Sequence, residues 1–118
     1  MRKFVKLDVP KVNVHALRIP TGWSIDKNNF WEIDPINLGE DDDTWFMFTD
    51  SLLQLHHQKK SVILDMGWKP DISPEGNFVV VILINEDWDK PIERFESKNY
   101  TEVIDYIETK LFEITTTD

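Results

Sequence analysis

Several short stretches of the chain alternate between apolar and polar residues, which is the pattern of half-buried β-strands. Two of these stretches, 4–9 and 12–19, each run into a proline, so we expect two edge strands near the start of the chain. The segment 20–23 predicts a turn, because its proline fixes one backbone corner and Gly22 accepts a positive φ at another.

The middle of the chain predicts a hairpin followed by an interior strand. Residues 51–57 alternate, 58–61 supply a polar turn, and an apolar segment follows directly. The segment 67–76 has the Gly, Pro, Asp and Ser content of a loop. The next segment is almost wholly β-branched or apolar, which is typical of a strand inside a sheet. The strands predicted after residue 40 are 45–48, which we expect to be extended and buried on both sides, 51–57, 62–66, 77–84 and 92–96.

The last segment changes from the strand period to the helix period. Its apolar residues, from Val103 to Ile114, recur at helical spacing, and Asn99 stands where an N-cap residue is preferred. This predicts one amphipathic helix from about Tyr100 to about Ile114. The whole pattern predicts an α+β fold, a mainly antiparallel sheet with a C-terminal amphipathic helix packed on one face, and a single domain over residues 1–118.

The chain has 118 residues and a formal net charge of −9, and the charge is unevenly placed. Residues 1–39 hold six basic and four acidic side chains, whereas the remainder holds seven and eighteen, a net charge of −11. Nucleic acid is a poor partner for such a surface, since phosphate binding needs clustered Lys and Arg. The same charge would steer a basic protein toward the chain, although in many domains acidity serves solubility alone.

The composition also narrows the chemistry. With no cysteine, the chain has no disulfide, no Cys-ligated metal and no thiol nucleophile. It contains no apolar stretch near the ~20 residues of a membrane span, and its first six residues are too charged for a signal peptide. We therefore expect a soluble, cytoplasmic protein without a cofactor and without a membrane partner; the oligomeric state is open.

The candidate catalytic and metal-binding residues have simple structural explanations. His56 and His57 are adjacent on a predicted strand, so their rings point to opposite faces and cannot readily share a metal ion. The acids at 41–43 lack the glycine and glutamate that a calcium loop of the EF-hand type needs at its sixth and twelfth positions. A weak cation site in this loop stays open. We expect no metal site, no catalytic residues and no enzymatic activity.

Tryptophan is frequent and stands close to acidic runs. Five tryptophans occur in the chain, and most of them are expected to close the ends of a small core. Trp45 and Trp88 each adjoin a run of acids, and exposed aromatic side chains beside charges are typical of binding hot spots. The residues predicted to bind a protein partner are Glu40, Asp41, Asp42, Asp43, Trp45, Glu86, Asp87, Trp88 and Asp89.

Three stretches carry a resemblance to a known group of proteins: Asn29 to Pro35 (NFWEIDP), Ile63 to Pro70 (ILDMGWKP) and Pro74 to Val80 (PEGNFVV). Their order, with a helix after them, resembles the small acidic immunity proteins of bacterial polymorphic-toxin and contact-dependent growth-inhibition systems. The resemblance implies a cytoplasmic protein that binds and neutralises one cognate toxin domain, commonly a nuclease, and has no catalytic residues. Within these motifs we expect Asp65, Gly67, Trp68 and Gly76 to be structural.

The sequence leaves three functional hypotheses open. The first is an immunity protein that covers the active cleft of a basic toxin domain, or mimics its nucleic acid, with the acids and tryptophans named above. The second is an adaptor that binds a peptide or protein at a sheet edge, where backbone pairing would dominate. The third is a small hydrolase or lyase acting through Asp65, His56 or His57, which would require a pocket that gathers these side chains.

Overall fold

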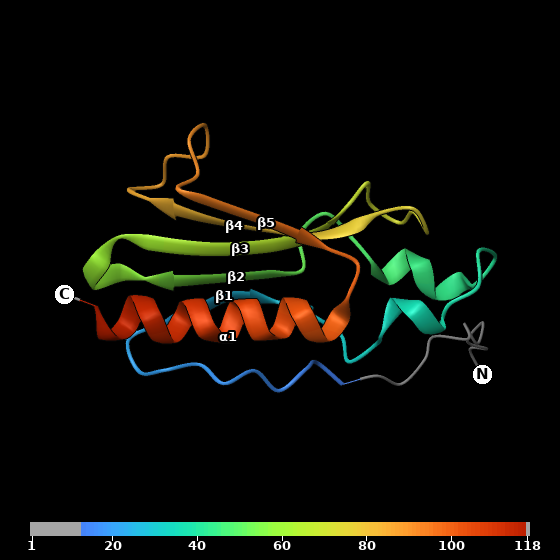
Figure 1. Ribbon diagram of the computed structural model, residues 1–118, viewed down its shortest axis with the longest axis horizontal. Coiled ribbons are helices and arrows are strands. Elements are labelled where there is room, and N and C mark those ends of the chain that lie inside the picture. Colours follow the sequence, from blue (N-terminus) through green and yellow to red (C-terminus); the bar gives the residue numbers. More distant parts are fainter. Residues whose placement is uncertain (1–12, 118) are drawn as a thin grey trace, which may run out of the picture.

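The computed structural model describes residues 13–117 and consists of one sheet and one α-helix with short 3₁₀ helices (Figure 1). The sheet is an antiparallel meander in which each strand pairs with the next, in the order β1-β2-β3-β4-β5. Its strands are β1 (Ser24–Asn28), β2 (Leu53–His57), β3 (Val62–Lys69), β4 (Asn77–Ile84) and β5 (Glu93–Ser97). The helix α1 is Tyr100–Thr116, and the 3₁₀ helices are η1 (Pro35–Asn37), η2 (Asp43–Met47) and η3 (Gln58–Lys60).

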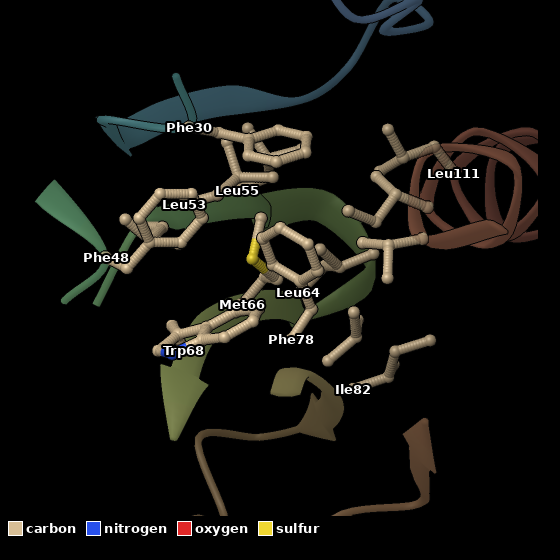
Figure 2. Close-up of a cluster of buried hydrophobic side chains, with 14 of the residues drawn as sticks. Phe30, Phe48, Leu53, Leu55, Leu64, Met66, Trp68, Phe78, Ile82 and Leu111 are labelled. Atoms are coloured by element: carbon tan, nitrogen blue, oxygen red, sulfur yellow. The ribbon is translucent and has the colours of Figure 1, made fainter. Parts of the chain in front are cut away.

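The core lies between one face of the sheet and α1. The register aligns Leu53 of β2 with Met66 of β3, Met66 with Val80 of β4, and Val80 with Phe95 of β5, so that alternate residues of four strands share this face. Figure 2 shows Leu53, Met66 and Phe78 on the side of the sheet that faces Leu111 of the helix. The helix contributes Val103, Ile107 and Leu111, all fully buried.

The predicted hairpin, interior strand and helix are confirmed. The turn between β2 and β3 contains η3 and ends at Ser61 in the left-handed region. The helix begins at Tyr100 as predicted, because the Asn99 side chain accepts a hydrogen bond of 2.9 Å from the Glu102 amide. It ends two residues later than predicted, at Thr116. The α+β architecture expected from the sequence is therefore the observed one.

Two glycines of the resemblance motifs are structural, as expected. A Cβ atom on Gly67 would lie 2.0 Å from the Asp50 carbonyl oxygen, and one on Gly76 would lie 2.3 Å from the Trp68 indole nitrogen. Both positions therefore exclude a side chain for packing reasons. The boundary predicted at Gly67 is wrong, however, because β3 continues to Lys69 and the loop begins after it.

The prediction for 45–48 is also wrong. Asp42 caps η2 by accepting a 2.8 Å hydrogen bond from the Thr44 amide, and the chain coils instead of extending. Phe46 is 47% exposed, so the segment is not buried on both sides. Four successive apolar residues suit a buried strand and one turn of helix equally well, and the acidic cap decides between them.

The start of the chain differs from the predicted pair of edge strands. The first of them, 4–9, lies outside the described residues. In 12–19, Val14 forms an isolated bridge with Trp31, and no strand is formed by residues 13–19. The turn at 20–23 is present, with Gly22 at φ 109°. The two edge strands of the described sheet are β1 and β5. The sequence did not predict β1, because it carries one apolar residue and no alternation.

Candidate partner-binding site

The two predicted acidic clusters lie at opposite ends of the sheet (Figure 1). Glu40–Asp43, called the acidic loop below, precede η2, and the chain after η2 meets the end of β3, where the Trp68 amide donates to the Thr49 carbonyl. Residues 85–92, called the β4–β5 turn, follow Ile84, which pairs with the first residue of β3. Because β3 has eight residues, about 23 Å separate its ends. The predicted contact residues therefore form two surfaces.

The acidic loop presents all four carboxylates to solvent. The Asp42 amide donates to the Gly39 carbonyl at 3.1 Å, so the loop has a defined turn. The Thr44 hydroxyl and amide hydrogen-bond the Asp42 carboxylate and lower its pKa, which keeps it charged. None of the four acids forms an ion pair with a described residue. Their charges are thus fully available to a partner.

Trp45 does not have the exposed position that its neighbouring acids indicated. It is only 6% exposed and packs against Phe48 and Trp68, with ring centroids 5.2 and 5.7 Å apart. Its indole N–H donates to the Gly39 carbonyl at 2.7 Å. Interpreting Trp45 as an exposed anchor is therefore wrong; it closes one end of the core and fixes the residue that precedes the acidic loop.

Beside the acidic loop lies a hollow of about 690 Å³, called the acidic hollow below. It lies between the start of α1, the η1 region and the loop that follows β3. Its apolar lining consists of Pro35, Ile36, Leu38, Trp45, Trp68 and Pro74. Its charged lining consists of Asp34, Glu40, Glu75 and Lys98. A volume of this size lies in the range typical of binding sites.

Tyr100 lines the acidic hollow, and its pKa responds to the acidic side chains nearby. Its hydroxyl lies 2.9 Å from His15 Nδ1 and is half-buried. Burial, with a smaller contribution from the nearby charges of Glu32 and Asp34, raises the pKa of Tyr100 to about 12. The part of this shift that comes from Glu32 and Asp34 reflects a negative potential beside Tyr100, which would attract a cation.

Sequence reasoning found only Glu40 and Trp45 of this hollow. Asp34, Glu75 and Tyr100 come from three separate segments, and only the fold brings them together. The one available signal was Asp34-Pro35, which starts η1 through an Asp34 cap on the Ile36 amide.

The β4–β5 turn carries the other predicted contacts. Asn85 and Glu86 have φ values of 55° and 57°, and the Asp87 amide donates to the Ile84 carbonyl at 3.2 Å, as in a tight hairpin turn. Trp88 is 51% exposed, and the acids Glu86, Asp87 and Asp89 around it are exposed as well. Ile84 and Ile92 add exposed apolar surface here. Trp88 is thus accessible enough to contact a protein partner, as its predicted binding role requires.

The residues of the hydrolase hypothesis are divided between the two sheet faces. Asp65 lies on the face opposite α1, where the Gln54 amide donates to it at 3.0 Å, and His56 shares that face. Burial raises the pKa of Asp65, although the hydrogen bond from Gln54 opposes the shift. His57 is buried on the helix side, with its ring 5.2 Å from that of Trp23. The three side chains share no common pocket.

Two further observations concern ions and membranes. Within residues 13–117, no three His, Asp or Glu side chains gather as a bound metal ion would require. None of the helices in that range combines the length and apolar character of a membrane span.

Comparison of the chain with protein-family models, with curated proteins and with solved structures finds no match.

Proposed function

We propose that this protein is a cytoplasmic immunity protein that binds and neutralises a cognate bacterial toxin domain by covering its active cleft. The observation that carries the proposal is the acidic end of the molecule, where the acidic loop adjoins the acidic hollow. Six carboxylates lie there, and none forms an ion pair with a described residue: Asp34, Glu40, Asp41, Asp42, Asp43 and Glu75. The sequence resemblance described above supports the same function.

The chemistry of this end suits a basic partner. A domain that cleaves nucleic acid needs a positively charged cleft, and a row of fixed carboxylates can occupy that cleft in place of phosphates. Clustered charges of one sign also raise the rate of encounter by about 10- to 1000-fold at low salt. The protein itself would perform no reaction, since inhibition requires only a stable complex.

The first test is growth rescue. The C-terminal domain of the large secreted protein expected from the adjacent upstream gene is expressed in a bacterial host with and without this chain. Immunity predicts arrested growth with the domain alone and normal growth when both are present. Continued arrest, together with a lack of complex formation by the purified pair, would contradict the proposal.

The second test separates electrostatic capture from other modes of binding. Replacing Asp41, Asp42 and Asp43 with Asn should slow association about tenfold at low salt and flatten its salt dependence. The matched control replaces Glu86, Asp87 and Asp89 with Gln and Asn, which removes the same charge at the opposite end of the sheet. If the association rate constant changes neither with salt nor with the substitution of Asp41–Asp43, capture by the acidic loop is ruled out.

One observation favours the sheet-edge adaptor as the second candidate. Among the described strands, β1 pairs only with β2, and four of its five residues are exposed. An extended peptide could continue the sheet there through backbone hydrogen bonds. This mode predicts an affinity that depends little on salt, so the kinetic experiment distinguishes the two functions.

A further inference from the structure

We infer that the acidic hollow is the docking site for one arginine side chain of the toxin domain. The inference rests on the function proposed above and adds the chemical identity of a contact. It is drawn from the charges, the hydrogen-bonding groups and the apolar surface of the hollow.

The charges of the hollow favour a cation. Asp34, Glu40 and Glu75 oppose a single ammonium group, that of Lys98. The start of α1 also lines the hollow and adds about half a positive charge. The balance remains negative by more than one charge, and no described residue forms an ion pair with the three acids.

The hydrogen-bonding groups of the lining point to the same ligand. The indole N–H of Trp45 donates to the Gly39 carbonyl, and that of Trp68 donates to the Ser73 carbonyl, each at 2.7 Å. The Tyr100 hydroxyl is bonded to His15. These donors are therefore already used, whereas the carboxylates of Glu40 and Glu75 can still accept. A ligand that supplies many donors and needs none in return matches this lining, and a guanidinium group carries five N–H donors and no acceptor.

The apolar surface selects arginine over lysine. Ile36 is 84% exposed at the hollow, and Leu38 and Pro74 are half-buried there, so a methylene stem can lie along them. Tyr100 is the partly exposed aromatic side chain of this lining, and an aromatic ring favours a planar, weakly hydrated guanidinium over a strongly hydrated ammonium. The volume of about 690 Å³ admits the side chain together with part of the loop that carries it.

The opposite polarity is the rival to be tested. Lys98 and the free amides at the start of α1 would favour a carboxylate or phosphate if they outweighed the acids. Whether the hollow binds a cationic or an anionic probe more tightly therefore decides the inference.

The experiment titrates the whole, ¹⁵N-labelled protein with N-acetyl-arginine methylamide and follows the tryptophan indole N–H signals by NMR. Trp45 and Trp68 line the hollow, while Trp88 lies at the other end of the sheet and serves as an internal control. A compound of this size should bind with a dissociation constant on the order of millimolar. The Trp45 and Trp68 signals should shift and saturate, and the Trp88 signal should not. N-acetyl-lysine methylamide should bind more weakly, and the anion N-acetyl-glutamate methylamide should leave all the signals in place.

Matched variants connect the response to the acids. Glu40→Gln with Glu75→Gln should weaken binding of the arginine probe by about fivefold, because two exposed ion pairs are lost. Asp26→Asn with Asp105→Asn removes the same charge at two exposed positions outside the hollow and should leave the binding unchanged. Glu40 and Glu75 are exposed, so unchanged unfolding midpoints are expected for both variants.

Three results would overturn the inference: no saturable shift of Trp45 and Trp68, a stronger response to the glutamate probe, or an equal loss in the two double variants. Because this titration needs no partner, its failure is distinct from a failure of growth rescue. Rescue without arginine binding would refute the hollow as a docking site and leave the immunity function standing. Arginine binding without rescue would refute the toxin as the source of the arginine.

Discussion

Replacing Leu111 with Ala should destabilise the protein by about 2.4–5 kcal/mol. The side chain is fully buried in the core between α1 and the sheet, and the change removes three carbon atoms. At about 0.8 kcal/mol for each buried methylene, transfer alone accounts for about 2.4 kcal/mol. The cavity that remains adds to this cost, and Leu-to-Ala changes at such sites extend to about 5 kcal/mol.

The neighbouring Phe112 provides the control. It is 63% exposed on the same helical turn, and Phe112→Ala should change the free energy of unfolding by less than about 0.5 kcal/mol. Urea unfolding followed by tryptophan fluorescence measures both variants under the same conditions. If Leu111→Ala cost less than about 0.5 kcal/mol, or no more than Phe112→Ala, the packing of α1 on the sheet described here would be wrong.

The remaining predictions concern the tryptophans, a carboxyl group and metal ions. Trp45→Ala should lower the free energy of unfolding by about 3–5 kcal/mol, because the side chain belongs to the core; urea unfolding measures this. Trp88→Ala should leave the free energy of unfolding unchanged, because the side chain is exposed. As a predicted hot spot, Trp88 should instead contribute about 2 kcal/mol to toxin binding, which surface-binding kinetics would show as faster dissociation. Because burial raises the pKa of Asp65 in the folded chain, the native state loses stability as the pH rises from the unfolded-state pKa through the folded-state pKa. Asp65→Asn should remove this loss, so the free energy of unfolding at pH 7 relative to that at pH 4 should be higher in the variant than in the parent protein. EDTA and Ca²⁺ should leave the melting temperature unchanged, whereas a saturated cation site in the acidic loop would add about 2.7 kcal/mol at a hundred times its dissociation constant.

The elements that the sequence predicted well are those whose burial imposes a clear period. The helix places an apolar residue on every turn toward the sheet, and its first turn is fixed by a local cap at Asn99. The β2–β3 hairpin alternates because one face of β2 packs against the core. In these segments the local pattern and the tertiary environment agree, so the pattern was sufficient.

The prediction failed where the environment is not periodic. β1 carries almost no apolar residues, because it lies at an edge and its side chains are exposed; only pairing with β2 makes it a strand. The run 45–48 is apolar for another reason, since Trp45 and Phe48 both close the end of the core from a 3₁₀ turn. The sequence could not predict the acidic hollow, because its lining comes from five separate stretches of the chain, 34–40, 45, 68, 74–75 and 98–101. No spacing rule connects residues that only the fold brings together.

The buried position of Trp45 joins stability to the proposed binding function. Trp45 packs on Trp68, Trp68 packs on Phe78 of β4 with ring centroids 4.9 Å apart, and the Trp45 indole holds the Gly39 carbonyl. The acidic loop is thus attached to the core through a short chain of aromatic contacts. Carboxylates fixed before the encounter lose less conformational freedom on binding than mobile ones do. A core substitution that loosens this aromatic group should therefore weaken toxin binding even though the altered side chain never touches the toxin.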